Sequence, residues 1–361
     1  MSADPERADL DARVLAWMRE PGFEPDEERF DNLARALFTH QFERCEPFRR
    51  LCRSRGRTPE RVTSWREIPA VPTGAFKEMP LRAFALERTL HTFRTSGTST
   101  AARGELHLDT LELYEASLLP TFRRMLLPEL GSRERIPFVV LAPSRTEAAD
   151  SSLSWMFDVV VRELGAPESV VGLDLERALT ALSSASEPVC LCGTAFALVH
   201  LLDSLAAQDR RLALPEGSRI METGGFKGRS REVPRAELRA ALGGALGVPV
   251  LRIVNQYGMT ELGSQFYDSS LARPEEPRRK LGPPWARARV LDPVDDREVE
   301  DGEAGVLVVT DLANTGSVIA VRTADRGRRL GDGFDVLGRE PGAEARGCSI
   351  AADELLARSG A

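Results

Sequence analysis

The sequence lacks the features of exported and membrane-embedded proteins. Its 361 residues include five cysteines, an odd number. No apolar run approaches the roughly 18–20 residues of a membrane-spanning helix. The N-terminus, MSADPERADLDARVL, has early acidic residues where a secretory signal would have an apolar segment. An odd cysteine count without an export signal favours free thiols over a disulfide framework. We therefore expect a cytoplasmic protein with no membrane span.

Lysine is also scarce, and acidic residues outnumber basic ones. The formal net charge is -7, and the isoelectric point is near 5.4. Of the 48 basic residues, 45 are arginines and three are lysines, which are Lys77, Lys227 and Lys280. This balance argues against a general attraction to nucleic acid, so we expect no nucleic-acid partner.

Several common site motifs are missing. There is no GxxxxGK[ST] loop and no GxGxxG turn between a strand and a helix, which argues against a Walker nucleotidase and a Rossmann enzyme. The four histidines are scattered without the spacing of metal ligands. Cys190 and Cys192 form a C-x-C pair within an apolar run, which favours buried strand residues over metal ligands.

The middle of the chain alternates strands and helices, a pattern typical of an α/β domain with a largely parallel sheet. Strands are predicted at 136–143, 188–193, 218–225 and 249–258, and helices at 151–164, 194–208 and 235–246. Two further helices are predicted at 26–51 and 111–125, the second with Pro120 near its middle.

Beyond residue 281 the pattern changes to strands and turns, which indicates a small β-rich subdomain. Its strands are predicted at 286–292, 304–311 and 317–325. We expect four segments along the chain: a helical N-terminal segment with a Pro-rich link (1–92), an α/β core (93–280), the β-rich subdomain (281–335) and a short C-terminal tail (336–361).

A run of hydroxyl and glycine residues lies within RTSGTST (94–100). Such a loop offers backbone N–H groups and hydroxyl donors without steric bulk, so it can wrap phosphate oxygens. Taken alone, the same composition is typical of an ordinary turn.

The segment VNQYGMTELGSQ (254–265) follows an apolar strand, and ligands bind at the carboxyl ends of strands in open α/β sheets. Tyr257 supplies a planar face, Thr260 a hydroxyl, and Glu261 a carboxylate suited to Mg²⁺. The alternative is a strand followed by a capped helix that has Thr260 and Glu261 in its first turn.

Three shorter segments have the same ambiguity. In ETGGF (222–226), the two glycines let a flat ring approach the backbone, and Phe226 offers a face to stack on it. Asp325 is expected after a strand, where its carboxylate could reach hydroxyls such as those of a ribose. Arg339 follows Gly338, a possible hinge, and could contact a phosphate or a ribose. Each of these segments alone is equally typical of a surface turn.

The order of these segments resembles that of the adenylate-forming superfamily, which includes acyl-CoA ligases, luciferase and nonribosomal adenylation domains. Within it the chain most resembles the LuxE acyl-protein synthetases, with phenylacetate-CoA ligase as a more distant relative. The phrases that carry this resemblance are GAFKEMP (74–80), FRTSGTST (93–100), ETGGFKGRSRE (222–232), NQYGMTELGSQFYD (255–268) and EARGCSIAADELL (344–356).

The resemblance implies an adenylate-forming α/β fold with a truncated C-terminal domain, and ATP and Mg²⁺ as cofactors. It also implies a role for each matched residue. Thr95, Ser96, Gly97, Thr98, Ser99 and Thr100 would hold the ATP phosphates, and Gly224, Gly225 and Phe226 would line the adenine. Tyr257 and Gly258 would lie near the nucleotide, Thr260 would contact the α-phosphate, Glu261 would bind Mg²⁺, Asp325 would hold the ribose, and Arg339 would lie near it.

The sequence departs from the superfamily in its lysines. The superfamily loop normally continues with Thr-Gly and a Pro-Lys pair, whereas Ala-Ala-Arg follows Thr100 here. Larger relatives carry a further C-terminal domain with a lysine that contacts the adenylating centre, and here no lysine follows Lys280. Arg94, Arg103 and Lys227 are candidates to supply the missing charge.

Cys348 lies in the tail, and in the LuxE family a cysteine near the C-terminus accepts the acyl group from the adenylate. The neighbouring Arg346 would favour its thiolate form. By resemblance we expect Cys348 to be this acceptor, and the alternative is an inert tail cysteine.

These features predict an ATP-dependent acyl-protein synthetase that makes an acyl-AMP from a carboxylic acid, expected to be a fatty acid, and then an acyl-thioester on a protein cysteine. One alternative is a carboxylate-CoA ligase of the phenylacetate-CoA ligase type. Another is an inactive nucleotide-binding or scaffold subunit. The expected partners are the acid and, by analogy, an acyl reductase or an acyl carrier protein.

Overall fold

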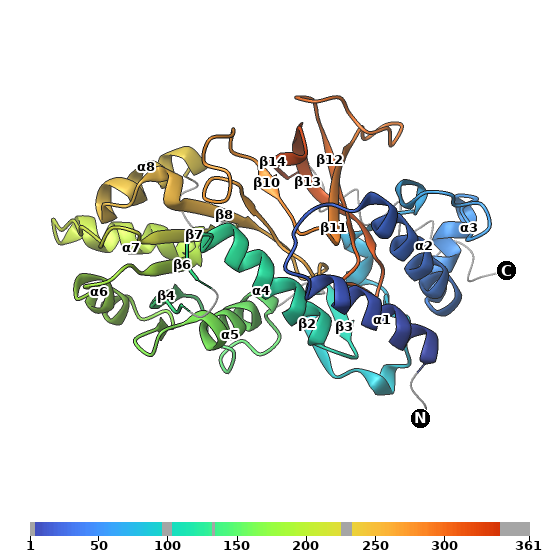
Figure 1. Cartoon of the computed structure of the whole chain (residues 1–361), viewed down its shortest axis with the longest axis horizontal. Coiled ribbons are helices and arrows are strands. Elements are labelled where there is room, and N and C mark those ends of the chain that lie inside the picture. The colour runs from blue at the N-terminus through green and yellow to red at the C-terminus, as the bar shows by residue number, and fades with distance from the viewer. Residues whose placement is uncertain (1–3, 96–102, 132–133, 225–232, 340–361) are drawn as a thin grey trace. The chain divides into compact units, whose positions relative to one another are not determined.

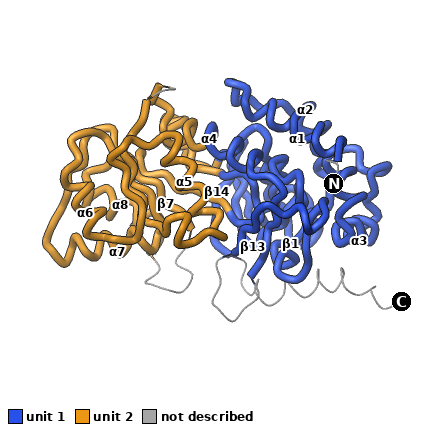
Figure 2. The backbone as a smooth tube through the Cα atoms, turned by 90° about the horizontal axis from the view of Figure 1, so that it is seen from below, with its two compact units in different colours: residues 1–120, 259–265, 281–361 blue, residues 121–258, 266–280 orange. Residues whose placement is uncertain are grey.

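The computed structural model describes residues 4–95, 103–131, 134–224 and 233–339 (Figure 1). The chain divides into two compact units, coloured separately in Figure 2. Unit 1 comprises residues 1–120, 259–265 and 281–361, and unit 2 comprises residues 121–258 and 266–280. The predicted N-terminal segment and β-rich subdomain both fall within unit 1, and the range 93–280 is divided between the units.

Unit 2 is built on a mostly parallel sheet. Its strand order is β9-β8-β7-β6-β4-β5, in which β9 alone is antiparallel to its neighbour. The strands are β4 (Phe138–Leu141), β5 (Val170–Val171), β6 (Cys190–Thr194), β7 (Arg219–Thr223), β8 (Ile253–Tyr257) and β9 (Phe266–Asp268). The predicted α/β architecture with a largely parallel sheet is therefore confirmed.

Helices cover both faces of this sheet. They are α5 (Ser152–Leu164), α6 (Leu175–Ser183), α7 (Ala195–Ala207) and α8 (Arg235–Leu246). One face packs against α6, α7 and α8 through a cluster that includes Leu191, Leu198 and Leu242. On the other face, Phe122 contacts Phe138 and Tyr267, with ring centroids about 6 Å apart. The continuous apolar strand runs follow from this double coverage, and Cys190 and Cys192 are buried strand residues as predicted.

Unit 1 contains an antiparallel sheet in the order β11-β12-β13-β14. Its strands are β11 (Ala286–Leu291), β12 (Ala304–Asp311), β13 (Ala320–Leu330) and β14 (Gly333–Arg339). The short β1 (Val71–Pro72) pairs in parallel with β13. A separate hairpin joins β2 (His91–Arg94) to β3 (Glu105–Leu108). The β-rich pattern after residue 281 is confirmed, whereas β14 was not predicted.

The N-terminal helices of unit 1 differ from the prediction in two ways. The structure has α1 (Pro5–Met18), which begins at an Asp4 cap whose side chain accepts the amides of Glu6 and Arg7. The predicted single helix 26–51 is wrong, because the chain forms α2 (Glu27–Arg44) and α3 (Glu46–Ser54). Cys45 lies between them in an extended conformation, since Pro47 has no N–H to continue the first helix.

Other boundaries also shift. The predicted helix 111–125 is present as α4 (Glu112–Leu126), with Pro120 inside it. The predicted strand 249–258 begins later, because Val250–Arg252 form a 3₁₀ turn ahead of β8. Asp325 lies inside β13 and not after a strand, because β13 continues to Leu330.

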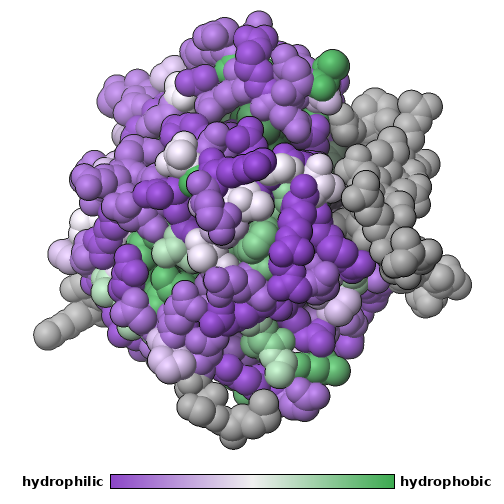
Figure 3. Space-filling view, turned by 90° about the vertical axis from the view of Figure 1, so that its right-hand side faces the viewer, coloured by the Kyte–Doolittle hydropathy of each residue, from purple (hydrophilic) through white to green (hydrophobic). Residues whose placement is uncertain are grey.

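The surface is predominantly polar on the face drawn in Figure 3, where apolar side chains occur singly or in small groups. Over the described ranges, each helix is too short or too polar to cross a membrane.

Candidate functional site

The predicted site residues belong to both units. Thr95, Thr260, Glu261, Asp325 and Arg339 are in unit 1, and Gly224, Tyr257 and Gly258 are in unit 2. The remaining predictions lie outside the described residues: Ser96, Gly97, Thr98, Ser99, Thr100, Gly225, Phe226 and Cys348.

The hydroxyl-rich run is the connection of the β2–β3 hairpin, and Thr95 closes its base. The Thr95 amide donates to the Gly104 carbonyl at 2.9 Å, and the Gly104 amide donates to Thr95 Oγ1 at 2.8 Å. Arg103 Nε donates to the Thr95 carbonyl at 2.6 Å. The Thr95 hydroxyl therefore accepts a hydrogen bond within the hairpin, and among the described residues its proton is donated to no acceptor.

Two predicted segments of unit 2 meet at the carboxyl edge of the parallel sheet. Thr223 of β7 is in register with Gln256 of β8. Gly224 and Tyr257 are the next residues along these two strands, so they lie at adjacent strand ends. The Thr223 hydroxyl donates to the Gln256 side chain, which ties the two ends together. Gly224 has φ +75° and open space where a Cβ would stand, a conformation that glycine adopts without strain.

The segment after β8 forms a turn and not a helix. Leu262 donates its amide to the Met259 carbonyl at 3.2 Å, with Thr260 and Glu261 between them, and the chain then enters β9. The alternative of a capped helix is therefore wrong. Gly263 is required in this turn, because a Cβ there would lie 2.7 Å from Ala313 Cβ.

Buried side chains of unit 1 hold this turn. Asp311 is fully buried and accepts the Ser264 amide and the Ser264 hydroxyl, both at 2.7 Å. Asn314 Nδ2 donates to the Glu261 carbonyl at 2.8 Å. Asp311, the last residue of β12, and Asn314, just after it, thus fix the backbone that carries the predicted Mg²⁺ ligand.

The Glu261 side chain is only 6% exposed. Burial raises the pKa of its carboxyl to about 7, although the positive charges of Arg339 and Lys77 act in the opposite direction. The negative charge of Asp325 raises this pKa further. Glu261 therefore shares an electrostatic environment with Asp325, Arg339 and Lys77, all within unit 1.

Asp325 and Arg339 face each other across strands. They are register partners on β13 and β14, and Arg339 Nε lies 3.7 Å from Asp325 Oδ1. The Arg339 side chain is 66% exposed and faces solvent, whereas the Asp325 side chain is 18% exposed and mostly buried. Gly338 precedes Arg339 with φ +126°, which L-amino acids rarely adopt.

Two kinds of residue that act on Glu261 or its turn were not predicted from the sequence. Lys77 lies in the phrase GAFKEMP and is one of three lysines, but no local pattern marks it as a source of charge near Glu261. Asp311 and Asn314 carried no signal, because their function depends on a contact with residues about 50 positions earlier.

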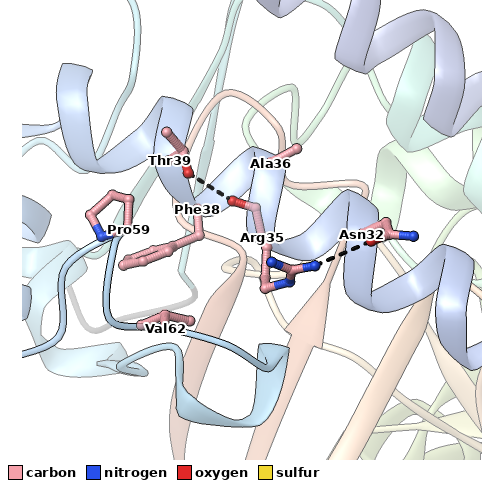
Figure 4. A pocket seen from close by; sticks show the side chains of 7 residues that line it. All are labelled: Asn32, Arg35, Ala36, Phe38, Thr39, Pro59 and Val62. Carbon is pink, nitrogen blue, oxygen red and sulfur yellow. Dashed lines mark hydrogen bonds between the residues drawn. The ribbon is translucent and has the colours of Figure 1, made fainter.

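Unit 1 has two other features in which a ligand or a metal ion could be sought. A hollow of about 260 Å³ on α2, shown in Figure 4, is lined by Asn32, Arg35, Ala36, Phe38, Thr39, Pro59 and Val62, none of them a predicted site residue. Ligand atoms of Asp4, Glu6 and His40 lie within 4.8 Å of one another, close enough to hold a metal ion. However, Arg44 binds the carboxylates of Asp4 and Glu6 at 2.7 and 2.9 Å, so both are already ion-paired and one of their two negative charges is offset.

We predict that Asp311→Ala lowers the free energy of unfolding by about 3 kcal/mol, because it leaves buried donors of Ser264 and Ala313 without an acceptor. Urea denaturation measures this change. Asp203→Ala, which truncates an exposed aspartate of α7, is the matched control and should change stability by less than about 0.5 kcal/mol. An Asp311 variant as stable as the control would contradict the anchoring role.

Comparisons with known proteins extend over nearly the whole chain. A family model described as acyl-protein synthetase, LuxE, matches residues 3–357. A long-chain-fatty-acid–luciferin-component ligase from Aliivibrio fischeri is 25% identical over 327 residues, covering 87% of this chain and 83% of that protein.

The fold is similar to that of solved ligases. A 2-hydroxyisobutyryl-CoA ligase in complex with 2-HIB-AMP and CoA matches with a TM-score of 0.62 at 15% identity, covering 88% of this chain and 76% of that one. A long-chain-fatty-acid–CoA ligase from Archaeoglobus fulgidus matches with a TM-score of 0.52 at 15% identity, covering 72% and 53%. At these identities the likeness shows the fold, and the predicted adenylate-forming fold class is confirmed.

Proposed function

The chain belongs to the LuxE acyl-protein synthetase family, and on that premise we propose that it activates a fatty acid with ATP and passes the acyl group to a protein cysteine. In the first step a carboxylate oxygen attacks the α-phosphorus, and pyrophosphate leaves with the electrons of the broken P–O bond. In the second step a thiolate attacks the acyl carbon of the adenylate and AMP leaves.

The observation that carries this proposal is the Thr260–Glu261 turn. A half-buried hydroxyl and a buried carboxyl stand side by side in the chain, on a backbone anchored by Asp311 and Asn314. Adenylation needs little covalent participation from the protein, and its rate depends on fixed donors and charges around the phosphates. The turn supplies a hydroxyl donor and a buried carboxyl that a bound cation would hold in its ionised form.

The Glu261 site fits Mg²⁺ in the manner of nucleotide enzymes. Mg²⁺ is commonly bound by one or two carboxylates and completed by substrate phosphates and water. Glu261 supplies one carboxylate whose raised pKa reflects burial without a cation. When bound, Mg²⁺ would neutralise charge on the phosphates, and Glu261 would hold it.

The other contacts of the nucleotide are assigned by resemblance and supported by position. Gly224 and Tyr257 lie at adjacent strand ends, where an adenine ring would find an open backbone and a planar face. Asp325 is held on β13 with its carboxylate partly exposed, as binding of ribose hydroxyls requires. Arg339, opposite Asp325, would lie beside the ribose.

ATP–pyrophosphate exchange tests the first step. The chain is expected to exchange label between pyrophosphate and ATP only when a suitable carboxylic acid is present, and a panel of acids of increasing chain length identifies the class. A folded protein that gives no exchange with any acid would favour the inactive scaffold.

A carboxylate-CoA ligase remains the second candidate, since the solved neighbours named above are CoA ligases that share this fold. It differs in the acceptor, which would be free CoA. We favour a protein acceptor because the matching family is one of acyl-protein synthetases, and we propose an acyl reductase or an acyl carrier protein as the partner that receives the acyl group.

A further inference from the structure

The lysines of this chain have different surroundings. Lys280 is 1% exposed, and its Nζ donates to Asp268 Oδ1 at 2.6 Å and to the Asn255 carbonyl at 2.8 Å. Its ammonium is therefore buried in unit 2 and already bonded there. Lys77 is exposed and makes no hydrogen bond or ion pair with the described residues. Lys227 lies outside the described residues.

The strand pairing places Lys77 toward Asp325. β1 runs parallel to β13, with Pro72 in register with Arg322. β12 occupies the other edge of β13 at Arg322, so β1 shares its edge with β14, which pairs with β13 from Asp325 onward. The chain continues from β1 into a 3₁₀ segment, Thr73–Lys77, in the direction of Asp325.

The same 3₁₀ segment also lies against the base of the hydroxyl-rich hairpin. It contacts both β13 and β3. A Cβ at Gly104 would lie 3.5 Å from Phe76 Cβ and 3.1 Å from Thr95 Cγ2. Lys77 therefore follows a residue packed against the two positions at which the hairpin loop begins and ends.

Three predicted site features converge on Lys77 within unit 1: the loop base, Asp325 on β13, and the buried carboxyl of Glu261. The charge of Lys77 lowers the pKa of that carboxyl, which is raised overall by burial. The ammonium is thus close enough to act on Glu261 while forming no ion pair with it.

We propose that Lys77 binds the phosphate oxygens of ATP and of the departing pyrophosphate, and so supplies the positive charge that the lysine-free loop lacks. This inference rests on the proposed function, since it assigns a role within the adenylation step. Lys77 forms and breaks no bond and transfers no proton. It stabilises the negative charge that grows on the leaving pyrophosphate.

A lysine suits this position. Its ammonium is a compact point charge with three rotatable donors on a flexible stem, so it can follow the phosphate from substrate to leaving group. The nearby Arg339 already has an acidic neighbour, Asp325 at 3.7 Å. Lys77 forms no ion pair with a described residue, so its ammonium would gain more from a phosphate than the guanidinium of Arg339 would.

The test compares Lys77→Gln and Lys77→Arg with the wild-type chain by ATP–pyrophosphate exchange and by calorimetric titration with Mg-pyrophosphate. We expect Lys77→Gln to slow exchange by about 100-fold, the effect of losing one transition-state donor. It should also weaken pyrophosphate binding by about tenfold. Lys77→Arg should recover most of the binding and part of the rate.

Arg55→Gln is the matched control, because it removes one exposed positive charge at the end of α3 in the same unit. It should match the wild type in both assays. A Lys77→Gln protein with wild-type thermal unfolding, exchange and pyrophosphate binding overturns the proposal for Lys77 and leaves the proposed function intact.

Absence of exchange in the wild type with every acid overturns the proposed function instead. Pyrophosphate titration then still decides on Lys77, since equal affinity of the wild type and Lys77→Gln would refute phosphate binding there. If Lys77→Gln does not fold, Lys77→Met provides the second neutral variant for the same measurements.

Discussion

Glu261→Gln is expected to make the protein more stable at neutral pH and, at the same time, to slow acyl-adenylate formation by about 100-fold or more. Both effects follow from one carboxyl. Its burial opposes ionisation, and burial raises its pKa to about 7. Glutamine has nearly the same shape and carries no charge, so it removes the unfavourable burial of charge together with the predicted Mg²⁺ ligand.

The pH profile gives the sign of the stability effect. The pKa of Glu261 is higher in the folded chain than the ordinary value of 4.5, so the folded state binds more protons between pH 4.5 and about 7. The contribution of this group to stability is full below pH 4.5 and is lost as pH rises to about 7. The loss amounts to roughly 3 kcal/mol.

The variant should therefore be as stable as the wild type near pH 4.5 and more stable above pH 7. Urea denaturation across this range, with a chelator present to exclude divalent cations, measures the difference. Glu24→Gln, which changes an exposed glutamate of unit 1, is the matched control and should leave both stability and exchange unchanged. A Glu261→Gln profile parallel to that of the wild type, or full exchange activity, would contradict the assignment.

The fold was largely predictable where local pattern and burial agree. The strands of unit 2 are covered on both faces, so their apolar runs stand out, and helix caps such as Ser151 and Thr194 mark the helix starts between them. The start of α1, which was not predicted, has the same kind of local signal, because the Asp4 cap is followed by Pro5 at the first helical position. The break at Cys45 was harder to predict, since the apolar spacing continues across it and Pro47 is the only local signal.

The residues of the candidate site were predictable from motifs, but their burial and the charges around them were not. The order of the motifs and the family resemblance that it carries pointed to Thr260, Glu261 and Asp325. The burial of Glu261 depends on a turn held by Asp311 and Asn314, which are distant in the chain. Lys77 is likewise brought toward Asp325 by a pairing between β1 and β13 that joins positions about 250 residues apart. Such long-range contacts leave no local pattern.

The acceptor of the acyl group is the remaining assignment with a large expected effect. Cys348 lies outside the described residues, so this prediction depends on its chemistry and on the family resemblance. We expect Cys348→Ser to abolish the covalent uptake of a labelled acyl group, because a serine hydroxyl is far less ionised than a thiol at neutral pH and attacks the adenylate poorly.

The same variant should retain ATP–pyrophosphate exchange at the wild-type rate, since the thiol acts only after the adenylate has formed. Gel fluorography with a labelled fatty acid and ATP, followed by hydroxylamine to cleave thioesters, measures acyl transfer beside the exchange assay. Cys52→Ser, at a buried free cysteine of α3, is the control, and this variant should take up as much labelled acyl group as the wild type. Undiminished hydroxylamine-sensitive labelling of Cys348→Ser would exclude Cys348 as the acceptor. With CoA added to the same reaction, rapid release of acyl-CoA by the wild type, with no label on the protein, would instead identify a CoA ligase.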